Sequence, residues 1–251
     1  MSAVRVYPDA AALARAAAEQ IAAIAGEAIA TGGRFSIALS GGSTPRAVYT
    51  LLASAAFAGR VDWARAHLFF GDERCVPPDH ADSNYRMASE TLLNHIAAPP
   101  DQVHRIRGEL SPPTAAAEYE QVLREFVVGS AAPRLDLILL GMGADGHTAS
   151  LFPGAAALRE TERWVVAVEH TQPPPPLVAR VTITPPVLAA AAHVVFLVSG
   201  ADKAERLRLV LTGPDQPDIL PAQLARPSNG TLLWLVDAPA ASSLGGENQG
   251  A

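Results

Sequence analysis

A histidine and an aspartate two positions apart, in a glycine-rich loop, are the residues of this sequence best suited to acid–base chemistry. Asp145 and His147 lie in Gly141-Met-Gly-Ala-Asp-Gly-His147, directly after the apolar run Leu135–Leu140. The ordinary pKa of histidine lies near neutral pH, and a nearby carboxylate can fix its tautomer and raise its basicity. Glycines let the backbone turn and let a ligand approach. We therefore predict that His147 is a general base that Asp145 orients; a structural histidine is the alternative.

Two earlier apolar runs also end in residues that could contact a ligand. The run Phe35–Leu39 is followed by glycines and by a helix that we expect Thr44 to cap, with Pro45 in its first turn. Because N–H groups at a helix N-terminus bind anions, the phosphate-binding candidates are Ser40, Gly41, Gly42, Ser43 and Thr44. The alternative is a tight turn without a ligand.

The run His67–Phe70 is followed by Gly71 and three charged residues, Asp72, Glu73 and Arg74. Charged groups straight after a buried strand need partners or a function. Arg74 could bind phosphate or stabilise an oxyanion, while Asp72 could bind substrate hydroxyls or orient Arg74. A local salt-bridge network is the alternative.

A fourth run, Val194–Val198, is followed by Ser199-Gly-Ala-Asp-Lys203, which contains the only lysine of a chain otherwise rich in arginine. A compact ammonium suits a place where a planar guanidinium would not fit, so Lys203 is a candidate substrate contact; chance is the alternative. Asp79, His80 and Asp82 lack the spacing of a metal motif, and we predict neither a metal nor an organic cofactor.

Apolar runs and helical patterns alternate along the chain. Further apolar runs lie at Trp164–Val168, Arg180–Ile183 and Leu232–Val236; helical patterns lie at Asp9–Ala30, Pro45–Phe57, Ser83–Ile96, Thr114–Val127 and Ala201–Leu211. This order predicts an α/β fold: one domain over residues 1–240, with a mainly parallel, Rossmann-like sheet covered by helices on both faces. Ligands bind at the carboxyl ends of such strands, where the four run ends can converge. We expect residues 241–251 to be a disordered tail.

Composition narrows the possible partners and compartments. The chain has 251 residues, a net charge of −6 and no basic stripe, which argues against binding nucleic acid. A single cysteine, Cys75, excludes an internal disulfide and suits a reducing compartment. Since neither a secretory signal nor a membrane-spanning apolar window is present, we expect a cytoplasmic protein, as a monomer or a weak homodimer.

Taken together, the segments that follow these four apolar runs resemble those of the 6-phosphogluconolactonases. The matching segments are Leu39-Ser-Gly-Gly-Ser-Thr-Pro45, Gly71-Asp-Glu-Arg-Cys-Val-Pro77 with Ser83-Asn84, Leu140–Pro153 and Val198-Ser-Gly-Ala-Asp-Lys203. The resemblance implies hydrolysis of 6-phospho-D-glucono-1,5-lactone in the oxidative pentose phosphate pathway. It implies that the phosphate lies near residues 40–44, with Arg74 and Lys203 as cations, and that His147 activates water.

Glucosamine-6-phosphate deaminases resemble the chain in the same loops but differ at two positions. They have tyrosine where this chain has Arg74, and a ring-opening glutamate where it has Phe152, which cannot transfer a proton. The comparison favours hydrolysis. Two alternatives remain: a deaminase or isomerase, and a non-catalytic sugar-phosphate-binding domain. A binding domain of this kind, as in transcription regulators, follows a DNA-binding segment, whereas we place the first strand of this chain from about Ala3.

Overall fold

The larger of two sheets is parallel throughout and has six strands in the order β1-β9-β8-β5-β2-β3. The computed structural model describes residues 2–127 and 133–245. Within them, the strands of this sheet are β1 Ser2–Tyr7, β2 Phe35–Leu39, β3 Ala66–Phe70, β5 Leu137–Gly141, β8 His193–Val198 and β9 Thr231–Asp237. The predicted mainly parallel α/β architecture is therefore confirmed.

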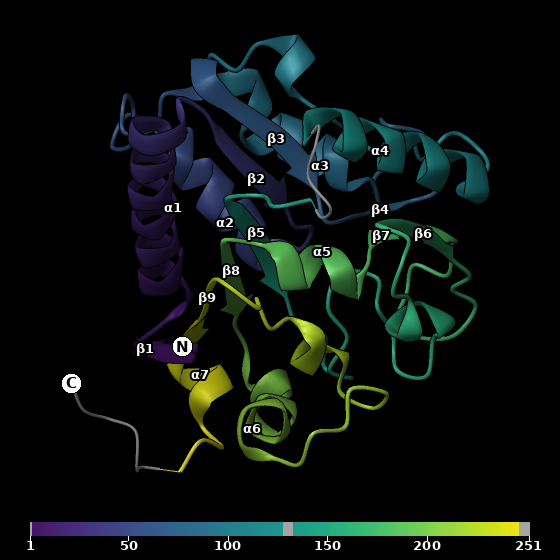
Figure 1. The fold of residues 1–251 in the computed structure, drawn as a ribbon. Helices are drawn as coiled ribbons and strands as arrows, with labels where there is room; N and C mark the ends of the chain where they lie inside the picture. The colour runs from purple at the N-terminus through teal and green to yellow at the C-terminus, as the bar shows by residue number, and fades with distance from the viewer. Residues whose placement is uncertain (1, 128–132, 246–251) are drawn as a thin grey trace.

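Helices cover both faces of this sheet, as the alternation of patterns predicts. They are α1 Ala10–Gly32, α2 Ser43–Leu52, α3 Asn84–Thr91, α4 Pro112–Phe126, α5 Pro185–Ala190, α6 Ala204–Thr212 and α7 Ala238–Ala241. Helices α1 and α2 pack on each other at one side of the strands, whereas α5 and α6 lie on the other side (Figure 1). Helix α1 buries one apolar face, and the side chain of Asp9 accepts a hydrogen bond from the N–H of Ala12 at its start.

A second sheet of three antiparallel strands, in the order β4-β7-β6, departs from the sequence prediction. Its strands are β4 Asp72–Arg74, β7 Arg180–Ile183 and β6 Val165–Val168. The sequence analysis predicted no second sheet; the runs 164–168 and 180–183 pair with each other and with β4 instead of joining the parallel sheet. Strand β7 is buried along its whole length, and a strand buried on both faces has the same apolar pattern in either kind of sheet.

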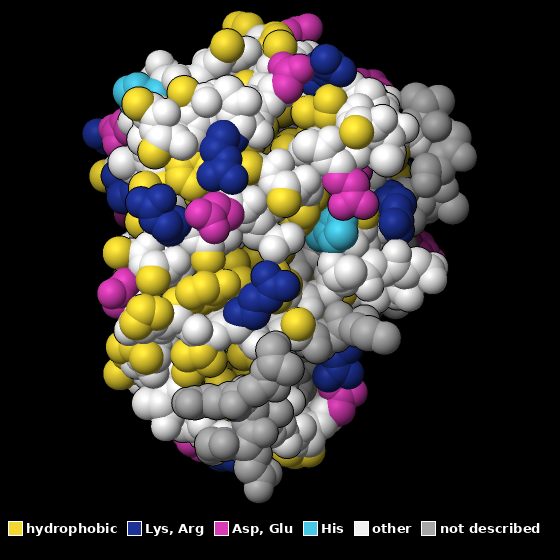
Figure 2. All heavy atoms as spheres, turned by 90° about the vertical axis from the view of Figure 1, so that its left-hand side faces the viewer, with side chains coloured by type: hydrophobic (Ala, Val, Ile, Leu, Met, Phe, Trp, Pro, Cys, Tyr) yellow, Lys and Arg dark blue, Asp and Glu magenta, His cyan; other side chains and the backbone are white. Residues whose placement is uncertain are grey.

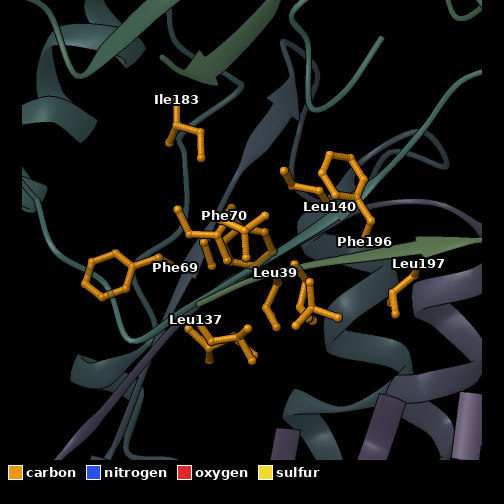
Figure 3. Close-up of a cluster of buried hydrophobic side chains, with 14 of the residues drawn as sticks. Leu39, Phe69, Phe70, Leu137, Leu140, Ile183, Phe196 and Leu197 are labelled. Carbon is orange, nitrogen blue, oxygen red and sulfur yellow. The ribbon is translucent and has the colours of Figure 1, made fainter. Parts of the chain in front are cut away.

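Gly71 joins the two sheets without an intervening loop. Its N–H donates to the carbonyl of Leu39 in β2 (2.9 Å), and its carbonyl accepts from the N–H of Ile183 in β7 (2.9 Å). Figure 3 shows side chains from both sheets in the hydrophobic core, among them Leu39, Phe70 and Ile183. The chain therefore passes from β3 of one sheet into β4 of the other through one fully bonded residue.

Two buried tyrosines complete the ends of β2 and β3. The hydroxyl of Tyr49 accepts from the N–H of Ser40 and donates to its carbonyl, both at 2.9 Å. The hydroxyl of Tyr119 does the same for Phe70, at 2.7 and 3.0 Å. Burial raises the pKa of both phenols, so they stay protonated and can donate.

The described surface outside the sheets has few large apolar side chains. On the face shown in Figure 2, charged side chains of both signs are interspersed with hydrophobic ones. None of the helices described is long and apolar enough to cross a membrane. Of the segment predicted as a tail, Ala241 ends α7 and Leu244 packs against the core, while residues 246–251 lie outside the described residues.

Candidate active site

The site lies where the connections from neighbouring parallel strands diverge. Strands β2 and β5 are adjacent, but the chain continues from β2 to β3 on one side and from β5 to β8 on the other. Such a switch point leaves a crevice at the carboxyl ends of the strands. It holds a pocket of about 180 Å³ between the loops after β2 and β5, with Asp72, Arg74, Asn84 and Arg180 in its walls.

The predicted Asp145–His147 pair is formed, and its histidine lines this pocket. The ring Nδ1 of His147 lies 2.6 Å from Oδ1 of Asp145, and the backbone N–H of His147 donates to the same oxygen (3.1 Å). Burial alone would raise the pKa of Asp145, but its hydrogen bonds with His147 and the charge of that ring lower it overall. The carboxylate can only accept, so Nδ1 carries the proton and Nε2 is the basic nitrogen.

Gly143 is the residue that lets this pair form. A Cβ at position 143 would lie 2.2 Å from Nδ1 of His147 and 2.6 Å from Oδ1 of Asp145. The loop is closed by a hydrogen bond from the N–H of Gly143 to the carbonyl of His147 (2.9 Å). The hydroxyl of Thr148 donates to the carbonyl of Gly141 (2.9 Å), which ties the loop to the end of β5. Close approach, more than unusual backbone angles, explains glycine at 143.

Phe152 forms a wall beside His147. The ring centroids of Phe152 and His147 are 4.7 Å apart, and the ring of Phe152 also stacks on His170 at 4.0 Å. The buried His170 in turn donates from Nε2 to the carbonyl of Pro174 (2.6 Å). These contacts fit a structural role for His170, which supports the ring of Phe152 beside His147.

The predicted phosphate loop contributes Ser40, Gly41 and Gly42 to the pocket lining; Ser43 and Thr44 are the first residues of α2 and do not line it. The N-cap is Gly42 rather than Thr44, and no side chain caps the helix. The first N–H groups of α2 have no intrahelical acceptor, as at any helix start.

Asn84, which sequence reasoning quoted only as part of a motif, lies against this loop. A Cβ on Gly41 would be 2.0 Å from its Oδ1, so only glycine allows the contact. The Nδ2 of Asn84 donates to Oδ1 of Asp72 (3.0 Å), and the hydroxyl of Ser150 donates to Oδ2 of Asp72 (2.6 Å). Asp72 thereby joins the start of α3 to the loop after β5, and it forms no ion pair with Arg74.

Two arginines line the pocket, although sequence reasoning identified only Arg74. Its Nη1 donates to the carbonyl of Asp82, and its buried Nε has no hydrogen-bond partner in the described structure. Arg180 is 4% exposed, and it donates from Nε to Val178 and from Nη2 to the carbonyl of Pro176. A charged residue at the start of an otherwise apolar strand was the signal that could have found Arg180.

Lys203 lies at the same edge of the sheet but outside the pocket lining. It ends a short turn after β8, where its Nζ donates to the carbonyl of Ser199 (3.1 Å) and contacts Oδ2 of Asp202 (3.2 Å). Asp237, at the end of β9, accepts from the hydroxyl of Ser199 and the N–H of Gly200 and so holds the turn. The role of Lys203 as a substrate contact stays a prediction.

Other reactive groups do not complete a metal or thiol site. Among residues 2–127 and 133–245, no group of three or more His, Cys, Asp and Glu side chains could hold a metal ion. Burial raises the pKa of the Cys75 thiol to about 11, so little thiolate is present at neutral pH. The ionisable side chains that line the pocket are those of Asp72, Arg74, His147 and Arg180.

Comparisons with known proteins find several that are similar to this chain over most of its length. A family model described as glucosamine-6-phosphate isomerases/6-phosphogluconolactonase matches residues 8–234. The chain is 40% identical to a rice protein (Oryza sativa subsp. indica) named probable 6-phosphogluconolactonase 3, chloroplastic, over 92% of this chain and 73% of that protein. It is also 40% identical to a 6-phosphogluconolactonase of Nostoc sp., over 96% of this chain and 98% of the relative.

A solved structure of 6-phosphogluconolactonase from Trypanosoma brucei matches 97% of this chain and 99% of its own, with a TM-score of 0.86 and 31% identity. Because the rice relative is named chloroplastic, the cytoplasmic location predicted from the sequence stays a prediction.

Proposed function

The chain belongs to the family of glucosamine-6-phosphate isomerases and 6-phosphogluconolactonases, and we propose that it hydrolyses 6-phospho-D-glucono-1,5-lactone to 6-phospho-D-gluconate. In this proposal it performs the lactone-opening step of the oxidative pentose phosphate pathway. The observation that carries the proposal is His147, paired with Asp145, in one pocket with a phosphate-type loop and two arginines. A base beside two kinds of anion site matches a substrate with a phosphate at one end and an ester at the other.

His147 acts as the general base. Its Nε2 takes a proton from a water molecule while the water oxygen bonds to C1 of the lactone, and the carbonyl electrons move to the C1 oxygen. When this intermediate collapses, the bond between C1 and the ring oxygen breaks, and His147 returns the proton to that oxygen. Asp145 keeps Nδ1 protonated and stabilises the imidazolium between the two steps, and a base of this kind is worth ~10²–10⁴-fold in rate.

Phe152 argues against sugar ring opening and deamination. Its ring contacts His147 at the position where the deaminases resembled by this chain have a glutamate. A phenyl group cannot relay a proton, but it can shield one side of the imidazole from water. The contact therefore supports hydrolysis at this histidine over amine release.

The test is a pair of assays on the purified chain. One follows acid release from freshly generated 6-phosphogluconolactone, corrected for spontaneous opening, and the other follows ammonia release from glucosamine 6-phosphate. We expect activity only in the first, and we expect His147→Ala to lower kcat by ~10²–10⁴-fold with little change in KM. Ammonia release without lactone hydrolysis would overturn the proposal, and full activity of His147→Ala would remove the general base.

A further inference from the structure

The two pocket arginines stand directly opposite each other on neighbouring strands. In the antiparallel pairing of β4 with β7, Arg74 is the register partner of Arg180. Like charges at directly opposite positions destabilise a sheet unless something offsets them. Neither guanidinium lies within 4.0 Å of a carboxylate in the described part of the chain, although ion pairs are common elsewhere on its surface. Asp72, Asp82 and Glu73 attract Arg180 only from beyond ion-pair distance, so the protein keeps two neighbouring cations without a carboxylate bonded directly to either.

The groups that hold the arginines orient them without neutralising them. Arg180 is buried and donates to the carbonyls of Val178 and Pro176, and Arg74 donates to the carbonyl of Asp82. Backbone carbonyls fix a guanidinium through partial charges and leave its net charge in place. The buried Nε of Arg74 has no partner at all within the described structure. Two guanidinium groups that are held by carbonyls and have no directly bonded carboxylate are suited to a ligand that brings negative charge.

Contacts with the aromatic wall show which end of the substrate this pair faces. The guanidinium of Arg180 lies 5.8 Å from the ring centroid of Phe152, whose ring also contacts His147. His147 is the base that the proposed function places at C1. The loop after β2 lines the same pocket with Ser40, Gly41 and Gly42, and we assign the phosphate to this loop and the helix start that follows it. The pocket therefore has one anion site for each end of the substrate.

We propose that Arg74 and Arg180 form a clamp for the C1 oxygen of the lactone and for the carboxylate of the product. The proposal rests on the function above and divides the anion-binding work: the arginine pair acts at C1, and residues 40–44 act at the phosphate. The carbonyl oxygen is neutral in the substrate and negative in the intermediate, so the clamp binds the intermediate more tightly and raises kcat. After collapse, the new acid loses its proton to water, and its two oxygens accept from the two guanidinium groups.

The test compares two ligands that differ only at C1. Binding of 6-phosphogluconate and of glucitol 6-phosphate, which has no carboxylate, is measured by titration calorimetry on the wild type, Arg180→Gln, Arg180→Lys and Lys203→Ala. We expect Arg180→Gln to weaken 6-phosphogluconate at least 10-fold and glucitol 6-phosphate less than 2-fold. Arg180→Lys keeps the charge but loses the planar fork, so it should fall between the wild type and Arg180→Gln. If Lys203 binds the phosphate, Lys203→Ala should weaken both ligands alike.

Controls separate this clamp from a structural role and from the proposed function. Arg65→Gln removes a half-exposed arginine just before β3, at the opposite end of the strands, and should bind both ligands as the wild type does. In lactone hydrolysis, Arg180→Gln and Arg180→Lys should lower kcat more than they raise KM. Equal weakening of the two ligands by Arg180→Gln, or no weakening, would overturn the clamp even if the wild type hydrolyses the lactone. A wild type without lactonase activity would overturn the function, and the ligand comparison would still decide the clamp.

Discussion

Replacing Gly143 with alanine tests how closely catalysis depends on the Asp145–His147 geometry. The added Cβ would lie 2.2 Å from Nδ1 of His147, whereas ordinary van der Waals contact begins at 3.4 Å. The ring must therefore move by about 1.2 Å or break its 2.6 Å hydrogen bond with Asp145. The backbone at 143 does not have a positive φ, so alanine adds contact without backbone strain. A misplacement of about 1 Å can cost ~10²-fold in rate, which is about 2.7 kcal/mol in the activation barrier.

The assay is steady-state lactone hydrolysis with kcat and KM determined separately. We expect kcat of Gly143→Ala to fall ~10²-fold while KM changes little, because the anion sites are untouched. Gly26→Ala is the matched control, since a Cβ at 26 in α1 meets nothing within 4 Å. Thermal unfolding of both variants should stay close to that of the wild type. A Gly143→Ala protein with wild-type kcat would show that the aspartate–histidine contact does not set the rate, and the reasoning would fail.

Two further predictions concern stability. Burial lowers the pKa of His104 from 6.5 to about 4, and the neighbouring ring of His67 contributes to this shift. As the pH falls, His104 therefore takes up a proton in the unfolded chain before it does so in the folded protein. The free energy of unfolding should accordingly decrease between pH 6.5 and pH 4. Urea unfolding at several pH values measures this slope, which should be shallower in His104→Phe; an unchanged slope would contradict the assignment. Tyr119→Phe leaves both backbone groups of Phe70 without a partner and should cost about 1–3 kcal/mol in urea unfolding at wild-type kcat. A loss below about 0.5 kcal/mol would mean that water replaces the hydroxyl.

The parts of the site that could be predicted from the sequence are local in the chain. Asp145 and His147 are two residues apart, and the loop residues 40–42 directly follow their strand, so type and spacing were informative. Parallel strands with helical crossovers bring their carboxyl ends to one edge, which is why separate run ends could be expected to meet.

The parts that could not be predicted depend on pairing between distant segments. Arg180 enters the pocket because β7 pairs with β4, and nothing in the local pattern of 180–183 distinguishes an antiparallel strand of a small sheet from a buried parallel one. Asp72 lines the pocket, and its role as a substrate contact stays a prediction, but its hydrogen-bond partners Asn84 and Ser150 come from other segments. The secondary structure of a residue depends largely on its neighbours in the sequence, whereas the partner of its side chain depends on how distant segments pack together.

Gly71 has a consequence for how substrate enters. The pocket lies between two sheets that meet at a glycine, and a glycine between two bodies is the usual place for a hinge. Here the N–H of Gly71 is bonded into one sheet and its carbonyl into the other, so rotation at this residue would break a hydrogen bond on each side. These two hydrogen bonds therefore oppose a jaw-like rotation of one sheet against the other, and we expect the two sheets to move as one frame. Access for the lactone, and exit for the acid, depend on side chains and loops at the rim.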